Sequence, residues 1–491
     1  MRSFTIIAVA CLLALGGAPF AQQPDALKAA ADTLGAGNVK TLQFTGWGET
    51  FTLGRSFTPN EPWPRVNVKN YTALINYDTA SMRVDMVRES GAVMPLGGGG
   101  PFTGEQRQIQ VVSGNQAWNV PAGGGSGAAP QAQPQPDAAV ERMLALWATP
   151  HGFVKAAMAN KATTRTVPGG TEVSFTVGGK YKMTGIISPQ NQVERVQTWI
   201  ANPQFGDLPV ETVYRVYRDF NGVLFPHNII QSQGGYPTLN VVIASVQVNP
   251  AVDITVPENV RTAQPAPMRV NVEKLADGVY FLTGGGVNNL VIDMRDHIVM
   301  VEAGDEEEWV LAYMAKAKEL IPNKPIRFVI TTHHHSDHEG GIRAFMDAGV
   351  TIVTHEIHRG FFEKIAVMPH TLEPDRLSTS KKAPKFQTVG VRGQLTDGTR
   401  TIELYENVGN VHSGGMVMVY LPKEKILAEA DAPGTAPNGP LNSGAVTSVA
   451  ATLNNIQRWK LDVQTIVPFH GGRTTTVAEL AKAIGRSPTT N

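Results

Sequence analysis

Alternating apolar and polar residues dominate the first half of the chain. Segments such as 41–47 and 82–87 place apolar residues at every second position, and turn residues such as Gly178-Gly179 separate the segments. A period of two is typical of strands with one buried face, and closely spaced turns favour antiparallel neighbours. The pattern therefore predicts an antiparallel sheet with strands at 41–47, 71–77, 82–87, 108–113, 172–177, 180–187, 193–200, 211–220 and 239–248.

Two helical segments and two insertions accompany this sheet. Residues 24–36 are rich in alanine, and residues 138–159 carry an apolar face that Pro150 interrupts, so we expect helices there. Insertions at 95–104 and 121–137 are rich in glycine and proline and lack the apolar residues needed for packing. Such composition is typical of mobile loops.

The pattern changes after residue 256. Residues 257–268 contain three prolines and few large apolar side chains, which indicates a linker. From residue 270 to 491, buried strand patterns alternate with helical ones, as in a layered α/β domain. We expect strands at 274–282, 289–293, 298–302, 326–331, 351–354, 401–405, 416–421, 426–431 and 465–470. A chain of 491 residues is long enough for two domains, which we assign to residues 24–256 and 270–491.

The N-terminus has the pattern of a secretory signal peptide. Arg2 precedes an apolar run from Phe4 to Leu15, and small residues lead to a cleavage site after Ala21, so residues 1–21 are expected to be removed. The apolar run is too short for a permanent membrane helix, and no later run reaches that length. We therefore expect a periplasmic or secreted protein without a transmembrane segment. Lipoprotein anchoring at Cys11, the sole cysteine, is the less favoured alternative.

Removal of the signal peptide would leave a chain without cysteine. Neither a disulfide nor a thiolate metal ligand is then available. The net charge is zero, which disfavours a nucleic-acid partner and favours a small-molecule substrate.

A histidine cluster directly follows the apolar run at 326–331. His333, His335, Asp337 and His338 lie within six residues, together with His334. Imidazole and carboxylate groups bind zinc and similar transition metals. In an extended loop His333 and His335 can face one metal, while Asp337 and His338 can turn toward a second.

Three more candidate ligands end predicted strands farther along the chain. They are His412, Asp431 and His470. Because α/β folds place their sites at the carboxyl ends of strands, we expect these side chains to join the cluster.

With these motifs, residues 270–490 resemble the metallo-β-lactamase fold superfamily, in the branches that use only His and Asp ligands. The resemblance implies two mixed sheets packed face to face between outer helices, so the whole chain would be of the α+β class with two domains. It also implies two zinc ions, other divalent transition metals being left open. By this resemblance the first ion would be held by His333, His335 and His412, the second by Asp337, His338 and His470, and both by Asp431 as a bridge.

The resemblance implies a hydrolase in which a hydroxide held between two zinc ions attacks a small ester, thioester, lactone or lactam. Asp337 or Asp431 would take or relay the proton. Three alternatives stay open: a dedicated β-lactam-hydrolysing enzyme, a phosphodiesterase or nuclease, and a carrier or binding protein with an inactive hydrolase domain. The chain departs from the family at Glu302, where an aspartate is common, and this puts fine positioning at the site in doubt.

Other polar residues receive structural interpretations. Asp305 opens an acidic run and is expected to cap a helix that reaches Leu320. His334 alternates with the ligands and should point away from the metals. His355 and His358 are expected in a loop or pocket wall, and His370 in a loop that could line the pocket.

Residues 38–256 resemble, more weakly, the half-barrel of periplasmic lipoprotein carriers. The resemblance rests on the run Lys180 to Pro226, and it implies a curved sheet with helices in its hollow. A lipid or envelope component is accordingly a candidate partner for this domain. The sequence leaves the oligomeric state open.

Overall fold

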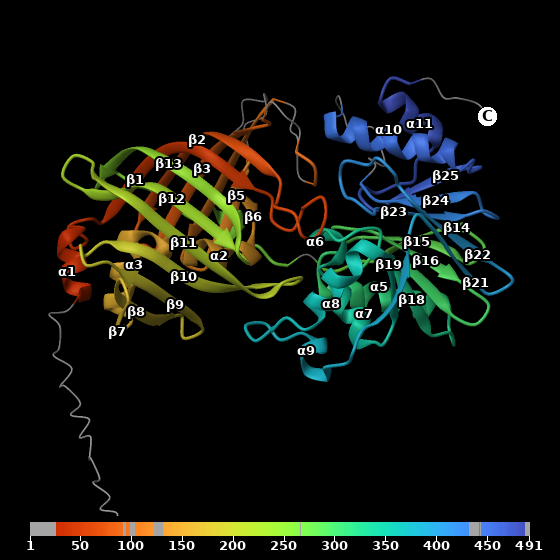
Figure 1. The fold of residues 1–491 in the computed structure, drawn as a ribbon, viewed down its shortest axis with the longest axis horizontal. Coiled ribbons are helices and arrows are strands. Elements are labelled where there is room, and N and C mark those ends of the chain that lie inside the picture. Colours follow the sequence, from red (N-terminus) through yellow and green to blue (C-terminus); the bar gives the residue numbers. More distant parts are fainter. Residues whose placement is uncertain are drawn as a thin grey trace, which may run out of the picture.

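The computed structural model describes residues 26–91, 95–98, 104–121, 131–265, 267–431, 441 and 443–486. The expected signal peptide, Cys11 and much of both insertions lie outside these residues. Figure 1 shows one large sheet formed by the first half of the chain, beside a layered arrangement formed by the second half. No helix in the described ranges is both long enough and apolar enough to cross a membrane.

The first half forms a 13-stranded sheet in which all neighbouring strands are antiparallel. The strand order is β6-β5-β4-β3-β2-β1-β13-β12-β11-β10-β9-β8-β7. The strands are β1 (Thr41–Phe51), β2 (Arg65–Asn76), β3 (Ser81–Glu89), β4 (Glu105–Ser113), β5 (Gln116–Val120), β6 (Gln133–Pro134), β7 (Thr163–Val167), β8 (Gly170–Val177), β9 (Tyr181–Ile187), β10 (Val193–Asn202), β11 (Gly206–Asp219), β12 (Leu224–Gln233) and β13 (Tyr236–Val248). The predicted strands are all present, and β5, β6, β7 and β12 are additional.

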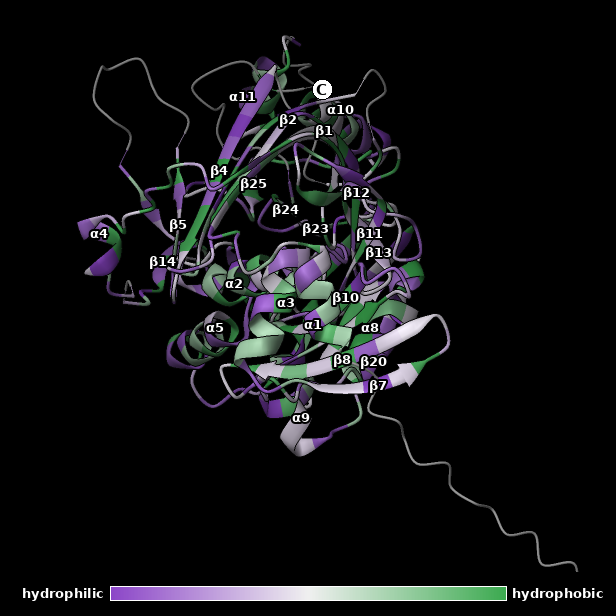
Figure 2. Cartoon of the chain, turned by 90° about the vertical axis from the view of Figure 1, so that its left-hand side faces the viewer, coloured by the Kyte–Doolittle hydropathy of each residue, from purple (hydrophilic) through white to green (hydrophobic). Residues whose placement is uncertain are grey.

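Two helices, α2 (Ala139–Ala148) and α3 (Pro150–Ala159), lie in the hollow of this curved sheet, and a third, α1 (Ala26–Thr33), lies at its end beside α3 (Figure 1 and Figure 2). Thr149 separates α2 from α3 and caps α3 by accepting a hydrogen bond from Gly152 N, so the predicted break at Pro150 is confirmed. Fully buried Phe153 and Phe225 lie in the core between the helices and the sheet.

Two expectations for this half need correction. Within the insertion at 121–137, Gln133–Pro134 form β6, which pairs with β5. Within the expected linker, a short helix, α4 (Glu258–Arg261), buries Val260 against Ile109 and Trp118. The segment at 133–134 pairs with β5, and the segment at 258–261 packs on β4 and β5. The N-terminal half of the structure therefore extends to about residue 261.

The second half contains two mixed sheets. The strand orders are β14-β15-β16-β17-β18-β19-β20 and β21-β22-β23-β24-β25. The strands are β14 (Asn271–Ala276), β15 (Val279–Thr283), β16 (Asn289–Asp293), β17 (Ile298–Val301), β18 (Ile326–Ile330), β19 (Thr351–His355), β20 (Lys385–Val389), β21 (Arg392–Thr396), β22 (Thr401–Glu406), β23 (Val417–Leu421), β24 (Ile426–Glu429) and β25 (Thr465–Pro468).

Helices cover the outer faces of these two sheets. One apolar core joins the inner faces of both sheets, a second joins the seven-stranded sheet to its helices, and a third joins the five-stranded sheet to its own. The helices are α5 (Glu307–Leu320), α6 (Ser336–Glu339), α7 (Ile342–Asp347), η2 (Glu356–His358), α8 (Arg359–Ala366), α9 (Arg376–Ser380), α10 (Ser443–Arg458) and α11 (Val477–Ala483). The predicted face-to-face packing of two sheets between helices is present.

Two local predictions in this half were wrong. The single strand expected at 274–282 is a hairpin, because Asp277-Gly278 turns the chain with Gly278 at φ +69°. Helix α5 begins at Glu307 with Glu306 at the cap position, so Asp305 does not cap it.

Candidate metal centre

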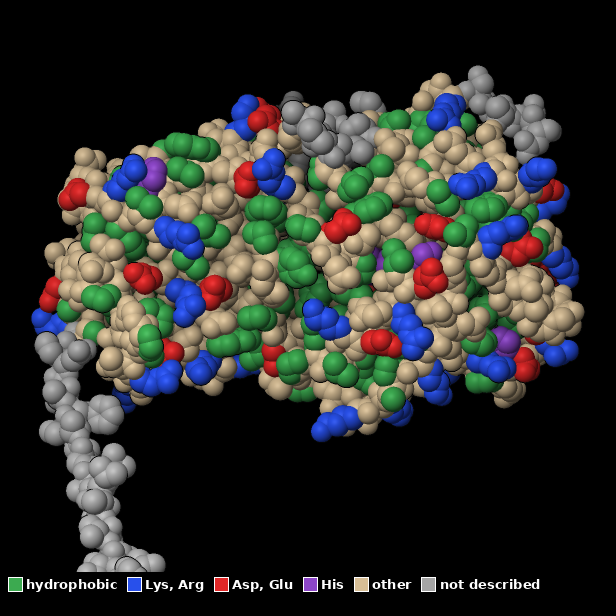
Figure 3. Space-filling model, viewed as in Figure 1, with side chains coloured by type: hydrophobic (Ala, Val, Ile, Leu, Met, Phe, Trp, Pro, Cys, Tyr) green, Lys and Arg blue, Asp and Glu red, His purple; other side chains and the backbone are tan. Residues whose placement is uncertain are grey.

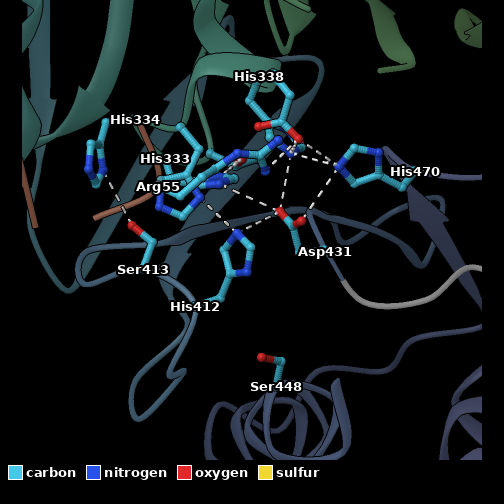
Figure 4. Close-up of polar contacts among 12 residues, drawn as sticks. Arg55, His333, His334, His338, His412, Ser413, Asp431, Ser448 and His470 are labelled. Carbon is cyan, nitrogen blue, oxygen red and sulfur yellow. Dashed lines mark hydrogen bonds and ion pairs between the residues drawn. The ribbon is translucent and has the colours of Figure 1, made fainter. Parts of the chain in front are cut away.

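Strand ends of the two sheets bring the candidate ligands together. His333 and His335 follow β18, and the short helix α6 turns Asp337 and His338 back toward them. His412 lies between β22 and β23, while Asp431 and His470 follow the parallel neighbours β24 and β25. Figure 4 shows the labelled members of this set converging from these different elements.

His333, His335 and His412 form one group. Their candidate ligand atoms all lie within 4.8 Å of one another. His335 Nδ1 is 2.8 Å from His412 Nε2, and the ring centroids of His333 and His335 are 4.4 Å apart. The first predicted set of three ligands therefore occurs as one cluster.

Asp337, His338 and His470 form a second group under the same 4.8 Å limit. His338 Nε2 is 3.1 Å from His470 Nε2, and Asp337 Oδ2 is 3.2 Å from His470 Nε2. The structure thus also brings the second predicted set together.

Asp431 lies between the two groups. Its Oδ2 is 3.4 Å from His412 Nε2 and 3.2 Å from His338 Nε2, and its Oδ1 is 3.5 Å from His470 Nε2. Its backbone has φ +61°, a conformation that non-glycine residues adopt rarely and that is often found at functional sites. The local strain fits a residue whose side chain must reach both groups.

The residues present fit a pair of divalent transition metals. His333 Nε2, Asp431 Oδ2 and Asp337 Oδ1 are buried without a hydrogen-bond partner among the described atoms. Ring nitrogens of different histidines face each other at 2.8 Å and 3.1 Å, where a shared cation would satisfy both. The donors are all imidazole or carboxylate, the chemistry that zinc accepts.

The electrostatics of the two groups differ. Burial lowers the pKa of His333, His335 and His412, so these imidazoles are neutral, the form that binds metal. Burial opposes the charged form of His470 as well, but hydrogen bonds to Asp337 and Asp431 outweigh it and raise the pKa of His470 to about 9. The imidazoles of the second group, which lie against Asp337 and Asp431, therefore favour the protonated form when no metal is bound, unlike those of the first group.

Glu302 contacts the ring nitrogen of His338 that does not face the other candidate ligands. Its Oε2 is 3.2 Å from His338 Nδ1, and its side chain is fully buried. Its φ of +75° is again rare for a residue other than glycine. The glutamate that replaces the expected aspartate thus still contacts a candidate ligand, and it orients that ligand's ring.

The other histidines lie outside the cluster. His334 points away toward Ser413 and Ser56, with Nε2 3.2 Å from Ser56 Oγ (Figure 4). His358 is buried and its Nε2 donates to Gly414 O, so it stabilises the loop that carries His412. His355 ends β19, and His370 lies in a loop 3.8 Å from Asp375.

A loop of the first sheet contributes residues that sequence analysis did not identify. It follows β1, and its Arg55 places Nη1 2.8 Å from Asp337 Oδ2. The carbonyl oxygen of Ser56 is 2.8 Å from His335 Nε2. Gly98 packs so close that an added Cβ would lie 2.9 Å from the ring of His412. No local pattern marks Arg55 and Ser56, because their partners are hundreds of positions away in sequence, whereas Gly98 lies in the glycine-rich insertion predicted at 95–104.

Asp305, which the sequence predicted to cap a helix, lies near the candidate metal centre instead. Its Oδ1 is buried without a hydrogen-bond partner among the described atoms, and its Oδ2 approaches Gly286. Burial raises the pKa of Asp305, and the negative charge of Asp337 adds to this effect. The acid therefore belongs to the surroundings of the second group and not to the helix cap.

Comparisons with known proteins agree with this geometry. The family model of the metallo-beta-lactamase superfamily matches residues 282–479. Over these residues the chain is similar to that superfamily, and the similarity supports a hydrolase. No curated protein gives a significant match to the chain.

Solved structures that match part of this chain include three described as metallo-beta-lactamases. The one from Pontibacter korlensis is 21% identical, with a TM-score of 0.35, and the match covers 44% of this chain and 97% of that protein. DIM-1 is 20% identical, with a TM-score of 0.34 and coverages of 44% and 95%. The one from Erythrobacter litoralis is 18% identical, with a TM-score of 0.33 and coverages of 44% and 94%.

Proposed function

We propose that the protein is an exported, metal-dependent hydrolase that cleaves a small ester, thioester, lactone or lactam at a site for two zinc ions or similar metals. The contact of Asp431 with both histidine groups carries this proposal. A carboxylate that contacts two clusters of imidazoles is the arrangement that a dinuclear hydrolase needs.

The side chains divide the work. His333, His335 and His412 would hold one ion, Asp337, His338 and His470 the other, and Asp431 would contact both. When bound, the metals would lower the pKa of a water molecule to near neutrality and polarise the substrate. Glu302 keeps the ring of His338 in place by contacting its Nδ1.

The acidic residues also set where protons can go. Asp337 is paired with Arg55, which together with His338 holds the pKa of Asp337 well below its usual range despite burial. Asp337 is thus kept ionised, the form in which a carboxylate binds a cation. Burial opposes the ionised form of Asp431 too, but His412 and His338 hold the pKa of Asp431 well below its usual range, so Asp337 and Asp431 are equal candidates for relaying a proton.

The N-terminal sheet is proposed to complete this site. Arg55 and Ser56 reach the cluster from the loop after β1, so the hydrolase part alone would lack them. A lipid or envelope component as partner of this sheet remains our expectation from sequence, as does export by the signal peptide at residues 1–21.

Metal analysis and a substrate panel would test the proposal. Purified protein dialysed against zinc should retain about two equivalents, measured by inductively coupled plasma mass spectrometry. The panel should contain a chromogenic cephalosporin, a glutathione thioester, acyl lactones, an aryl phosphodiester and an aryl sulfate. Zinc-dependent cleavage of a carbonyl substrate is expected. Failure to take up zinc would refute the metal site. Cleavage of the phosphodiester alone would show that the protein is a phosphodiesterase and not a hydrolase of carbonyl substrates.

A further inference from the structure

A cavity of about 550 Å³ lies between the two parts of the chain. Its walls come from the loop after β1, the turns that precede β11 and β13, and the segment of η2, α8 and the residues that follow. None of the seven candidate ligands lines it. Figure 3 shows hydrophobic side chains gathering on the surface at this boundary.

Aromatic side chains from both parts make the walls. Trp63 is 7% exposed and lies 5.1 Å from Tyr236 between ring centroids, both in the first part. Phe205 meets Phe361 across the boundary edge to face at 6.2 Å, and the ring of His334 lies 5.4 Å from Phe361. Such a volume with packed aromatic walls is typical of small-molecule pockets.

The charges on the lining are unequal. Asp207 already accepts hydrogen bonds from Thr371 N and Leu372 N, each at 2.9 Å. Lys364 is exposed at the rim, and no ion pair joins it to any residue within the described ranges. The cavity therefore combines apolar walls with one carboxylate that backbone amides already engage and one lysine that has no ion-pair partner within the described ranges.

We propose that this cavity is a second binding site, for a small amphipathic anion such as a medium-chain carboxylate. The hydrocarbon packs among Trp63, Phe205 and Phe361, and the carboxylate pairs with Lys364. The site is separate from the proposed hydrolytic centre, because the segment Gly54–Ser56 and His334 stand between them. Its occupancy needs no metal.

Gly360 offers a way to fill the cavity. It lines the space on helix α8, and an added Cβ would meet no atom within 4 Å. Gly360→Trp therefore introduces a large side chain without backbone strain, and it removes a glycine from a helix, which favours folding. Gly37→Trp is the matched control, since its Cβ also meets nothing within 4 Å and it does not line the cavity.

The test is isothermal titration of decanoate into the full-length protein in EDTA. Saturable one-site binding is expected for the wild type and for Gly37→Trp, with a loss of about tenfold or more in affinity for Gly360→Trp. Absence of saturable binding, or equal affinity in Gly360→Trp, overturns the proposal. Because metal is absent, these outcomes do not depend on whether the protein is a hydrolase.

A second variant tests the charge. Lys364→Met should weaken decanoate binding by about threefold, the scale of an exposed ion pair, and leave the binding of uncharged 1-decanol unchanged. Equal decanoate affinity in Lys364→Met overturns the assignment of an anion. An equal loss for both ligands does so too, since it would show that Lys364 acts only through packing.

Discussion

The guanidinium of Arg55 lies 2.8 Å from Asp337, with Nη1 facing Oδ2, and so joins a loop of the N-terminal sheet to the histidine cluster. The side chains of Arg55 and Asp337 are only 24% and 17% exposed, so solvent screens this pair incompletely. A hydrogen bond between charged groups in such a place contributes about 1.5–3 kcal/mol. The contact makes this loop of the N-terminal sheet part of the surroundings of the candidate metal centre.

Arg55→Met should retain the metals but lose activity. All seven candidate ligands are intact in this variant, so metal content should match the wild type. Loss of the charged partner of Asp337 should lower kcat/KM by about 10–100-fold, equivalent to the hydrogen-bond energy above. Arg65→Met is the control, because Arg65 pairs with Glu49 on the exposed surface. Wild-type kcat/KM in Arg55→Met would show that the contact is only structural.

His335→Ala should abolish both metal uptake and turnover. His335 contacts His412 and belongs to the tightest part of the first group. His334→Gln is the adjacent comparison, because His334 points toward Ser56 and Ser413 and not into the cluster. Mass spectrometry under native conditions should show two metals in His334→Gln and none in His335→Ala. Equal metal content in the two variants would contradict the assignment of His335.

The extent to which sequence predicted this site follows from the range of each contact. His333, His335, Asp337 and His338 are neighbours in sequence, and His412, Asp431 and His470 each come after a strand, so spacing and strand patterns predict all seven as candidates, and the structure brings them together. Arg55 and Ser56 follow an ordinary strand, and only tertiary packing of two separate sheets brings them to the cluster.

Some local sequence patterns are compatible with two different structures, and the sequence alone could not choose between them. An acid before a helix serves equally as a cap or as a site residue, and at Asp305 burial near Asp337 decided the outcome. The Asp277-Gly278 turn divides what looked like one strand. The 13-stranded sheet was predicted as antiparallel. Alternation of apolar residues cannot show, however, that β1 and β13, the first and last strands in sequence, pair with each other.

Glu302→Gln should weaken binding of one metal. The amide keeps the shape of the side chain but removes the negative charge that faces His338 Nδ1. Loss of such a partner typically lowers metal affinity by about 10–100-fold, which competition with a chromophoric chelator would measure. Glu308→Gln on the exposed face of α5 should have wild-type affinities. If both variants bound metal equally, Glu302 would have no role in orienting His338.

Acid should destabilise the N-terminal part through His151. This side chain is fully buried with Nε2 2.9 Å from Leu34 O, and burial lowers its pKa to about 4. The unfolded chain binds the proton near pH 6.5 and the folded chain only near pH 4. The stabilisation from neutral His151 is therefore complete above about pH 6.5 and is lost as the pH falls toward 4, by at most about 3 kcal/mol. Urea unfolding of wild type and His151→Gln at pH 7 and pH 5 should show a smaller pH dependence in the variant, and equal dependence would exclude His151 as its source.

A truncated chain of residues 265–491 should separate folding from activity. It retains the three apolar cores around the two mixed sheets, so it should fold and bind about two metals. It lacks Arg55 and Ser56, and it exposes Phe361 and Met368, which line the cavity in the whole protein. We expect native-like circular dichroism with kcat/KM at least as low as that of Arg55→Met. Full activity in the truncated chain would contradict a role for the first sheet in the site. An insoluble product beside a soluble full-length protein would show instead that the two halves fold as one unit.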